Sequence, residues 1–571
     1  MNRDLGALST RTFDLVIIGG GIFGACAAWD AAQRGLSVAL LERGDFAHAA
    51  SANCFKIAHG GIRYLQHGDL VRLRESSRER RALLRIAPHL VSPLPVVIPT
   101  YGHGRRGQEL LRLGTTMYDA LTWDRNAGLD DPQRRIPPVR SLSRERCLEL
   151  FPGLRRDGLT GGVLFHDAQI FSPARLALAF LQSAADAGAS VANYVEANGF
   201  VRQADRVAGV RATDRLSGRS LEVRGAVVLN AAGPWAERLL ADRLALRLQR
   251  PLTFSRDAAF VIRGRVTNGY TLAVQASTMD PDAVLSRGGR HLFLAPWRDY
   301  TLIGVWHVVH RGHPDEVAIT DQDLQRFLDE VNDAYPALGL TRRDVTSRLA
   351  GLTLFGDNSA GATRLRYGHR SVLIDHEQEH GVQGLISLVG VRYTTARGMA
   401  QRGVDLVFQK LGRRSPRCRT ASTTIRGGHV GRTTDFERQA MQTRPIAISE
   451  ASFLGLLRNH GAAYRSIMQH VQETPALAQT LDGSSVLRAE VVHAVREEMA
   501  QTLADVVFRR TDLGTGEHPG QAALRACADV MAAELGWDAA RVQRELEEVG
   551  RVDPNSGAGK ETHDLCSRPC A

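Results

Sequence analysis

Residues Phe13 to Glu42 read FDLVIIGGGIFGACAAWDAAQRGLSVALLE. An apolar run leads into a turn with glycines at Gly19, Gly21 and Gly24. An alanine-rich stretch follows, and a second apolar run ends at the carboxylate of Glu42. This order of strand, glycine turn, helix, strand and acid is typical of a dinucleotide-binding βαβ unit. We therefore expect a dinucleotide site near the start of the chain.

The three glycines have different physical tasks in such a unit. Gly19 permits the sharp turn, Gly21 lets the backbone approach a pyrophosphate, and Gly24 lets the helix pack close to its strand. The N-terminus of the helix then presents its free N–H groups to the phosphates. Glu42 would accept hydrogen bonds from ribose hydroxyls and would repel a 2′-phosphate, so NADP is disfavoured.

Three later segments carry a resemblance to a known family. They cover residues 51–64 (SANCFKIAHGGIRY), 227–235 (VVLNAAGPW) and 390–397 (GVRYTTAR). Together with the glycine turn, they resemble the FAD-dependent glycerol-3-phosphate dehydrogenase family, within the D-amino-acid-oxidase-like group, over roughly residues 12–550. The resemblance implies an α/β FAD-binding domain of the Rossmann-like, doubly wound type. It also implies a mainly antiparallel β substrate domain and a C-terminal α-helical domain.

The recognisable pieces of the FAD-binding domain are far apart in the sequence, so we expect this domain to be discontinuous. Short β-like runs predominate in the two inserts between its pieces and favour a sheet there. The predicted FAD-binding domain is 12–60, 166–244 and 381–412, the substrate domain is 61–165 and 245–380, the helical domain is 413–550, and 551–571 is a polar, flexible tail.

Local patterns predict several elements of this arrangement. Ser172 and Pro173 indicate the N-cap and first position of a helix. Residues 190–195 and 223–230 read as strands, and the second would deliver residues 231–233 to the cofactor. Residues 487–499 carry a helical pattern that belongs to the C-terminal domain.

The resemblance also implies which residues hold the FAD. They are Gly19, Gly21, Gly24, Glu42, Arg43, Ser51, Val195, Ala232, Gly233, Gly390, Thr394 and Thr395. Thr394 and Thr395 are expected to hydrogen-bond the flavin tail or its pyrimidine edge. The alternative for both threonines is that they cap the helix that follows.

Oxidation of an alcohol by a flavin needs a base for the hydroxyl proton and positive charge for the developing flavin anion and an anionic substrate. The resemblance assigns catalytic roles to Lys56, Arg63, Tyr64 and Arg392. Arg392 stands where the family commonly has a lysine, so the charge is kept while the geometry becomes a planar fork. Surface ion pairs for the two arginines and core packing for Tyr64 are the alternatives.

The predicted substrate domain departs from the family pattern at three places. Residues 305–307 read VWH where Thr-Thr-Asp is expected, and residues 254–257 read FSRD in place of a segment like Lys-Gly-Ser-His. Residues 351–354 read GLTL where the family carries a run like Gly-Val-Arg-Pro. The usual phosphate clamp and a usual candidate base are therefore missing from their expected positions.

Other residues offer replacements, each with a structural role as the alternative. His307 is a candidate base. The candidates for a rebuilt anion site are Arg256, Arg348, Arg364, Arg366, His369 and Arg370. The histidines at 307, 310 and 313 recur every three residues, but no carboxylate or cysteine completes a ligand set, so we expect no metal.

The composition fits a large enzyme with a basic surplus. The chain has 571 residues, which favours more than one structural unit, and its formal net charge is +11. This surplus favours anionic partners, such as a small phosphorylated substrate or an acidic lipid surface. Nucleic acid is the competing partner; we disfavour it because the arginines are dispersed and no recognised motif is present.

Cysteine usage and hydropathy predict the compartment. Seven cysteines, an odd number without disulfide-scaffold or zinc spacing, favour a reducing cytoplasm. We see no signal peptide before Phe13 and no run near the roughly 18 apolar residues of a membrane-spanning helix. Any membrane contact is therefore expected to be peripheral, on the inner face of the cell membrane.

The resemblance implies oxidation of the C2 hydroxyl of sn-glycerol-3-phosphate to dihydroxyacetone phosphate, with hydride transfer to flavin N5 and quinone or oxygen as the electron acceptor. Because the substrate domain diverges, two alternatives stay open. One is a paralogue that oxidises another hydroxy acid, a phosphonate or an amine. The other is a non-catalytic, flavin-bound binding subunit. A homodimer is also left open.

Overall fold

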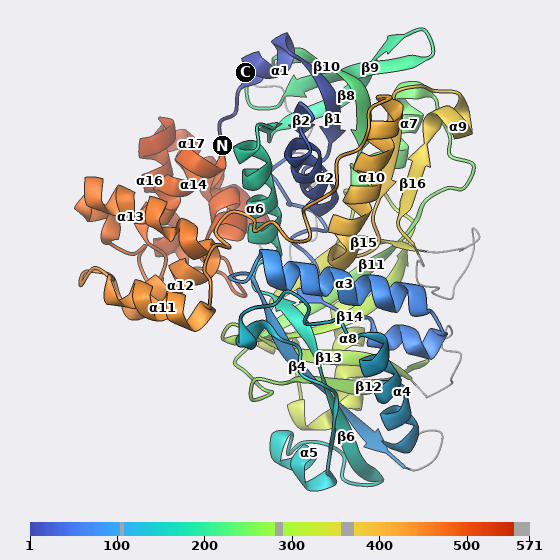
Figure 1. Ribbon diagram of the computed structural model, residues 1–571. Coiled ribbons are helices and arrows are strands. Elements are labelled where there is room, and N and C mark those ends of the chain that lie inside the picture. The colour runs from blue at the N-terminus through green and yellow to red at the C-terminus, as the bar shows by residue number, and fades with distance from the viewer. Residues whose placement is uncertain (103–107, 280–288, 356–369, 553–571) are drawn as a thin grey trace.

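The computed structural model describes residues 1–102, 108–279, 289–355 and 370–552. Two sheets and a group of C-terminal helices make up this part of the chain (Figure 1). The first sheet and its helices lie in the upper part of the view, the second sheet lies below, and the orange and red helices lie to one side.

The first sheet is built mainly from parallel strands. Its members are β1 (Thr12–Ile18), β2 (Val38–Leu41), β7 (Ser190–Ala192), β8 (Val195–Gln203), β9 (Arg206–Asp214), β10 (Ser220–Asn230), β16 (Val372–Asp375) and β17 (Leu385–Val389). The order is β16–β17–β10–β1–β2–β7, and β9 pairs with β10 and β8. β1 lies between β10 and β2 and is parallel to both. This confirms the Rossmann-like fold expected from the glycine turn.

Both faces of this sheet are covered, which explains why residues 13–18 are apolar almost without interruption. Leu15 and Ile17 pack against α2 (Ile22–Gln33), α6 (Pro173–Asp186) and α10 (Ala396–Lys410). Phe13 and Val16 pack on the opposite face against apolar residues of β8 and β9. The helix predicted from Ser172 is α6, and the Ser172 side chain accepts a hydrogen bond from the backbone N–H of Arg175.

The single strand predicted over 190–195 is two strands. β7 ends at Ala192, and Tyr194 has a positive φ of 55° that turns the chain away before β8 begins at Val195. β7 continues the parallel sheet beside β2, whereas β8 forms an antiparallel pair with β9. The prediction was wrong because apolar periodicity does not reveal a one-residue turn.

The second sheet is mainly antiparallel, as expected for the substrate domain. Its members are β3 (Ile57–Ala58), β4 (Val91–Tyr101), β5 (Arg140–Leu142), β6 (Leu159–Ile170), β11 (Thr253–Arg263), β12 (Thr271–Met279), β13 (Gly289–Trp297), β14 (Tyr300–His310) and β15 (Val345–Phe355). The order is β15–β11–β14–β13–β12–β4–β6–β3, with β5 beside β6, and only the β12–β4 pair is parallel.

Helix α8 (Asp321–Ala334) covers one face of this sheet. Its Phe327 contacts Phe260 of β11 edge-on, with ring centroids 4.8 Å apart. On the other face, Ala259 and Leu302 form a small apolar cluster with Phe55. The loop around residue 55 follows the glycine-turn unit, so this face of the second sheet looks toward the predicted cofactor site.

The expectation that short β-like runs predominate over 61–165 was wrong. This insert contains α3 (Leu70–Ile86), α4 (Gln108–Leu121) and α5 (Arg144–Leu150) in addition to strands. The Asp69 side chain caps α3 by accepting a hydrogen bond from Arg72 N. Arginine has a high helix propensity, but the many arginines of α3 interrupt its apolar stripe. The helical periodicity of apolar residues was therefore weak in the sequence.

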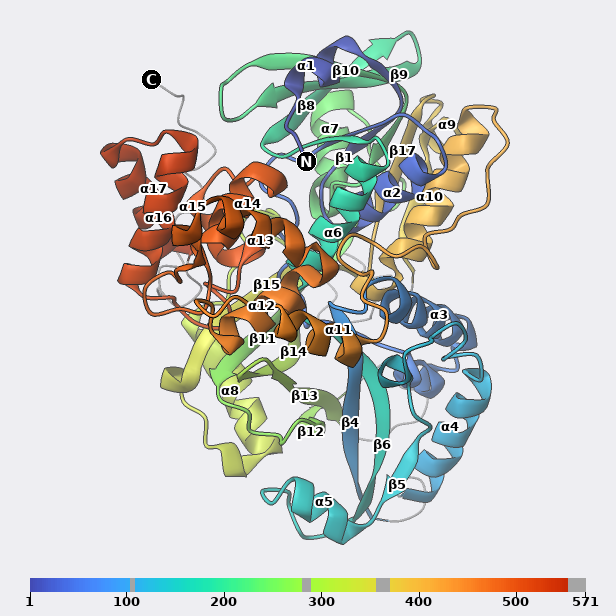
Figure 2. The same cartoon turned by 60° about the vertical axis from the view of Figure 1, so that its left-hand side comes forward.

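The C-terminal helices confirm the predicted helical domain (Figure 2). They are α11 (Thr433–Gln442), α12 (Glu450–His460), α13 (Tyr464–Glu473), α14 (Arg488–Glu498), α15 (Leu503–Asp505), α16 (Gln521–Leu535) and α17 (Ala539–Val552). α14 matches the helix predicted over 487–499. Figures 1 and 2 both place this group beside α6. Of the predicted tail, residues 553–571 lie outside the described part of the chain.

The remaining elements are short connections and caps. The α-helices are α1 (Leu5–Thr10), α7 (Ala236–Leu244) and α9 (His376–His380), and the 3-10 turns that concern the site are η1 (Ile62–His67), η4 (Gly233–Trp235) and η7 (Tyr393–Thr395). Among the described residues, none of the helices combines the length and apolar character that crossing a membrane requires.

Candidate active site

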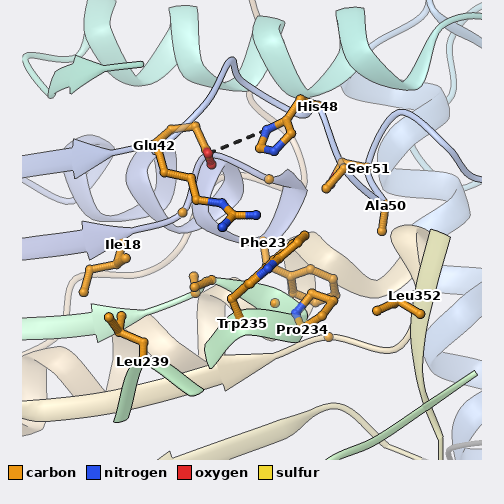
Figure 3. A pocket seen from close by; sticks show the side chains of 18 of the residues that line it. Ile18, Phe23, Glu42, His48, Ala50, Ser51, Pro234, Trp235, Leu239 and Leu352 are labelled. Atoms are coloured by element: carbon orange, nitrogen blue, oxygen red, sulfur yellow. Dashed lines mark ion pairs between the residues drawn. The ribbon is translucent and has the colours of Figure 1, made fainter. Parts of the chain in front are cut away.

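A cavity of about 500 Å³ opens where β1, β2, β10 and β17 end and the second sheet faces them (Figure 3). Its walls include nine residues that the sequence analysis assigned to the cofactor or to catalysis. They are Gly19, Gly21, Glu42, Arg43, Ser51, Ala232, Gly233, Gly390 and Arg392. Four separate stretches of the chain thus meet at one site, and β15 contributes Leu352 and Thr353 from the second sheet.

The glycine turn leaves no room for side chains at two of its positions. A Cβ at Gly19 would lie 2.6 Å from the carbonyl oxygen of Ala231, and Gly19 has a φ of +106°. A Cβ at Gly24 would lie 1.9 Å from the carbonyl oxygen of Gly19. These contacts hold the first turn of α2 directly against the end of β1. Gly21 is the N-cap of α2, and Gly21, Ile22 and Phe23 line the cavity, so the N-terminus of the helix lies at the cavity wall.

Glu42 directly follows β2 and is buried beside the glycine turn. Its carboxylate accepts hydrogen bonds from the backbone N–H groups of Gly20, at 2.6 Å, and Gly44, at 2.9 Å. His48 Nδ1 lies 3.6 Å from the same carboxylate. The Ser51 hydroxyl accepts a hydrogen bond from the N–H of Ile22 at 3.0 Å, which ties the 49–54 loop to the start of α2.

Arg43, Trp235 and Asp315 form a cluster at the wall of the cavity. Arg43 Nη2 lies 2.6 Å from Asp315 Oδ1, and the Trp235 indole N–H donates to the same oxygen at 2.9 Å. The Arg43 guanidinium also stacks 4.2 Å above the Trp235 ring. Burial raises the pKa of Asp315, but the contacts with Arg43, His313 and Trp235 outweigh it and lower that pKa.

Phe23 and Gly390 also line the cavity, and they lie against each other. A Cβ at Gly390 would lie 1.7 Å from the Phe23 ring, so only glycine fits there in this arrangement. The Arg392 guanidinium lies 4.9 Å from the centroid of the Tyr64 ring, and Arg72 lies 4.7 Å from that centroid. Tyr64 is buried and lies behind the cavity wall, so its contact with the site runs through Arg392.

Comparison with known proteins decides the family. A model described as FAD dependent oxidoreductase matches residues 14–405, and one described as the C-terminal domain of alpha-glycerophosphate oxidase matches residues 418–542. The chain is 32% identical to a Synechocystis protein named glycerol-3-phosphate dehydrogenase, covering 95% of this chain and 97% of the relative. A protein of that name from Mycobacterium leprae is 32% identical, covering 94% of this chain and 87% of the relative. The chain belongs to the FAD-dependent glycerol-3-phosphate dehydrogenase family.

A solved structure agrees with the fold. The glycerol-3-phosphate dehydrogenase from Bacillus halodurans, complexed with FAD, superposes with a TM-score of 0.75 at 24% identity, covering 97% of this chain and 96% of that one. FAD is the cofactor of the family, and the cavity suits it. The helix N-terminus, the tight glycine turn and the buried acid of β2 are the groups that a pyrophosphate and a ribose require.

Several other predicted residues lie outside the cavity wall. Val195 is buried in the core, and its backbone N–H donates to the carbonyl of Glu42 at 2.7 Å, so it supports the acid from behind. Thr394 Oγ1 accepts a hydrogen bond from His59 N, and Thr395 Oγ1 donates to Arg392 O, both at 3.3 Å. Both threonines are buried and link loops around the site. Thr395 is the N-cap residue of α10, but its side chain makes no capping hydrogen bond there.

Lys56 is buried beside the second sheet. Its Nζ lies 4.7 Å from the centroid of the Trp297 indole and 3.4 Å from the carbonyl oxygen of Ala52. Burial lowers the pKa of Lys56 to about 8. Cys54, two residues earlier, lines the cavity, whereas Lys56 lies outside the wall. A catalytic role for Lys56 stays a prediction.

The backbone of Arg63 lies in η1, but its side chain falls outside the described part of the structure, as do Arg364, Arg366 and His369. Two other arginines of the expected anion site form ion pairs with carboxylates of α8. Arg256 lies 2.9 Å from Asp323, and Arg348 lies 2.8 Å from Asp321, both at the first turn of α8. These arginines hold α8 on the face of the sheet away from the cavity. Arg370 is exposed.

His307 Nδ1 lies 2.6 Å from Asp257 Oδ1. The sequence analysis treated positions 257 and 307 separately and missed this pair, because it depends on the register of β11 and β14. It also missed Asp315 and the packing of Phe23 on Gly390, for which no local pattern gave a signal. Trp235 was quoted in a family segment, but no role was assigned to it.

Proposed function

We propose that this chain oxidises the C2 hydroxyl of sn-glycerol-3-phosphate to dihydroxyacetone phosphate. The observation that carries the proposal is the convergence of the glycine turn, Glu42 and Arg392 on one cavity, in a chain similar over almost its full length to relatives named glycerol-3-phosphate dehydrogenase. When bound, FAD supplies a hydride acceptor at its N5 atom.

Different residues of the chain bind the pyrophosphate, the ribose and the substrate. Gly21 and the N-terminus of α2 hold the pyrophosphate, and Glu42 accepts hydrogen bonds from the ribose hydroxyls. Arg392 provides positive charge in the cavity for the anionic substrate or for the developing flavin anion. Roles for Arg63, Tyr64 and Lys56 in this chemistry belong to the same proposal.

Anaerobic absorbance spectroscopy tests this function. The yellow holoprotein is titrated with sn-glycerol-3-phosphate, and loss of the flavin band reports hydride transfer. The enantiomer sn-glycerol-1-phosphate and unphosphorylated glycerol are matched controls, because they test stereochemistry and charge separately. Bleaching by sn-glycerol-3-phosphate at least 100-fold faster than by either control supports the proposal. Absence of bleaching by this substrate contradicts it.

One observation favours a second substrate class. Arg256 and Arg348, which were expected to help replace the phosphate clamp, are held by α8. A paralogue that oxidises another hydroxy acid, a phosphonate or an amine would need a different arrangement of charge. Bleaching by a member of such a panel, and not by sn-glycerol-3-phosphate, would assign this class. Bleaching by none of these compounds would favour a non-catalytic binding subunit.

We propose a quinone or oxygen as the electron acceptor. We also propose that the chain binds an acidic membrane surface peripherally from the cytoplasm. Leu70 and Val71 are exposed at the start of α3, and Trp123 is 79% exposed. Asp124, the neighbour of Trp123, pairs with Arg74 and Arg81 of α3. Exposed apolar side chains beside a basic helix suit an anionic lipid surface.

Sedimentation with lipid vesicles tests this surface. Binding to vesicles with anionic lipid that is lost with purely zwitterionic lipid, or on Trp123→Ser exchange, supports it. Equal recovery in the supernatant with both lipids contradicts it. Light scattering after gel filtration gives the oligomeric state, for which a homodimer remains the proposal.

A further inference from the structure

Asp257 and His307 are direct partners across two antiparallel strands. The register of β11 and β14 pairs Asp257 with His307, and their side chains meet at 2.6 Å between Oδ1 and Nδ1. The next pair along the two strands is Ala258 opposite Trp306, and neither of these side chains is charged. Side chains directly opposite each other on one face of an antiparallel pair are close enough to interact. The contact is therefore a consequence of the sheet, not of a flexible loop.

The pair lies on the face of the sheet that looks toward the cofactor cavity, directly behind Thr353, which lines the cavity, whereas Asp257 and His307 lie outside the lining. Trp306 stacks on Phe327 of α8, with ring centroids 5.8 Å apart, so the next side chain, His307, points to the opposite face. Gly351 of β15 is the partner of Asp257 on the other side. A Cβ at Gly351 would lie 2.9 Å from the carbonyl oxygen of Asn53. The 49–54 loop, which lines the cavity, thus covers this face.

The contacts of Asp257 hold its carboxylate in position to accept a hydrogen bond from the His307 imidazole. It also accepts hydrogen bonds from the hydroxyls of Ser255 and Thr353, and Thr353 lines the cavity. Burial raises the pKa of Asp257, but the contact with His307 and these hydrogen bonds outweigh it and lower that pKa. An ionised carboxylate can only accept, so His307 Nδ1 carries the hydrogen, and Nε2 is the ring nitrogen that can take a proton.

The two positions correspond to two separate departures from the family pattern. The resemblance implies histidine at 257 and aspartate at 307, whereas this chain has aspartate at 257 and histidine at 307. Considered separately, each change removes a residue that the resemblance leads us to expect. The strand register shows that Asp257 and His307 form one pair in this chain, so the histidine and the carboxylate stand on exchanged strands relative to the pattern that the resemblance implies.

We infer that His307 is the proton acceptor for the substrate hydroxyl in this chain, and that Asp257 is its positioning residue, in an exchanged arrangement. The inference rests on the proposed oxidation of a hydroxyl group. The hydroxyl proton moves to His307 Nε2, and the hydrogen on the same carbon leaves with its electron pair as hydride to FAD, so that a carbonyl remains. A half-buried aspartate behind the imidazole fixes its orientation and stabilises the charge that it gains.

A double-mutant cycle tests the exchange directly. The four proteins are the wild type, Asp257→His, His307→Asp and the double variant that carries both changes. Each single variant faces two like residues across the strands, whereas the double variant restores one histidine and one carboxylate. Stopped-flow flavin reduction gives the rate constant and the substrate concentration at half saturation. FAD content and the urea midpoint of unfolding provide readouts that do not depend on turnover.

We expect each single change to lower the reduction rate constant about 100-fold or more, with the half-saturating concentration changed less than about threefold. The double variant should recover at least tenfold over both single variants, and its urea midpoint should return toward that of the wild type. His310→Gln, three residues along β14, is the matched control and should leave the rate constant unchanged.

Rates within threefold of the wild type in both single variants would overturn the inference, as would a double variant no faster than the single variants. If a single variant fails to retain FAD, His307→Gln and Asp257→Asn replace it and carry the same expectation. If another hydroxy compound, and not sn-glycerol-3-phosphate, bleaches the wild type, the proposed substrate fails and the cycle is run with that compound. The urea midpoints test the exchange independently of any substrate.

Discussion

Arg175 of α6 and Glu498 of α14 form a fully buried ion pair, with 2.6 Å between Nη1 and Oε2. A second buried pair lies nearby, because Arg510 donates to Asp45 at 2.7 and 2.8 Å. In both pairs, one residue belongs to the segment matched by the FAD-binding family and the other to the C-terminal helices. Two buried ion pairs, Arg175–Glu498 and Asp45–Arg510, thus connect the C-terminal helices to the FAD-binding part of the chain.

Arg175→Met should destabilise the protein strongly. It leaves Glu498 buried and without its main cation, and removal of one partner of a buried pair costs about 3–5 kcal/mol. Urea unfolding followed by circular dichroism measures the loss. Arg525→Met is the control, because Arg525 pairs with Asp529 on an exposed helix face and such pairs contribute about 0–1 kcal/mol. Equal midpoints for both variants would contradict a stabilising role for the buried pair.

Glu490→Gln should change how stability depends on pH. Burial raises the pKa of Glu490 to about 8, whereas an unfolded glutamate titrates near pH 4.3. Its contribution to the free energy of unfolding is therefore fully present below about pH 4 and is lost as the pH rises toward 8. Glutamine keeps the acceptor for the Leu487 N–H and does not titrate.

The stability of Glu490→Gln relative to the wild type is therefore expected to rise steadily from pH 5 to pH 8, as measured by urea unfolding at each pH. Glu473→Gln changes an exposed residue and should follow the wild-type slope. A constant difference between Glu490→Gln and the wild type at all pH values would show that Glu490 does not titrate in this range.

Gly21→Leu should abolish FAD retention. The N-cap of α2 lies at the cavity, and a Cβ there already meets the Ser51 hydroxyl at 3.1 Å, so a leucine occupies the space through which a pyrophosphate approaches. The ratio of flavin to protein absorbance in the purified protein is expected to fall at least tenfold. Gly114→Ala, at an open helical position, should retain the normal ratio. A fully yellow Gly21→Leu protein would contradict the site.

Arg392→Ala should weaken substrate binding while FAD is retained. Loss of a charge-assisted hydrogen bond is worth about 1.5–3 kcal/mol, which corresponds to roughly 10- to 100-fold in the half-saturating concentration. Arg392→Lys keeps the charge and should recover most of the affinity. Flavin reduction at a series of substrate concentrations measures both variants. If alanine and lysine behave alike, the charge at position 392 does not contact the substrate.

The parts of the fold that could be predicted from the sequence are those set by local spacing. The contacts of Gly19 and Gly24 could be predicted because a tight turn and a helix packed closely on its strand require glycine at fixed intervals. The helix cap at Ser172 is equally local. The break at Tyr194 and the helices between residues 61 and 165 were missed, because apolar periodicity is ambiguous in short strands and in arginine-rich helices.

The parts of the site that could not be predicted depend on contacts between distant segments. Asp257 and His307 are 50 residues apart, and only the strand register makes them partners. Asp315 reaches Arg43 across 272 residues. A single sequence shows which residue types are present but not which of them meet, so His307 could be named as a candidate base but not as the partner of Asp257.

The cluster of Arg43, Trp235 and Asp315 has a consequence for how the two sheets are held together. Arg43 follows β2, Trp235 follows β10, and Asp315 follows β14, so the cluster joins the two sheets across the cavity wall. Separation of the two sheets at this wall would break one ion pair and one indole hydrogen bond, and both of these contacts are made to the same Asp315 oxygen.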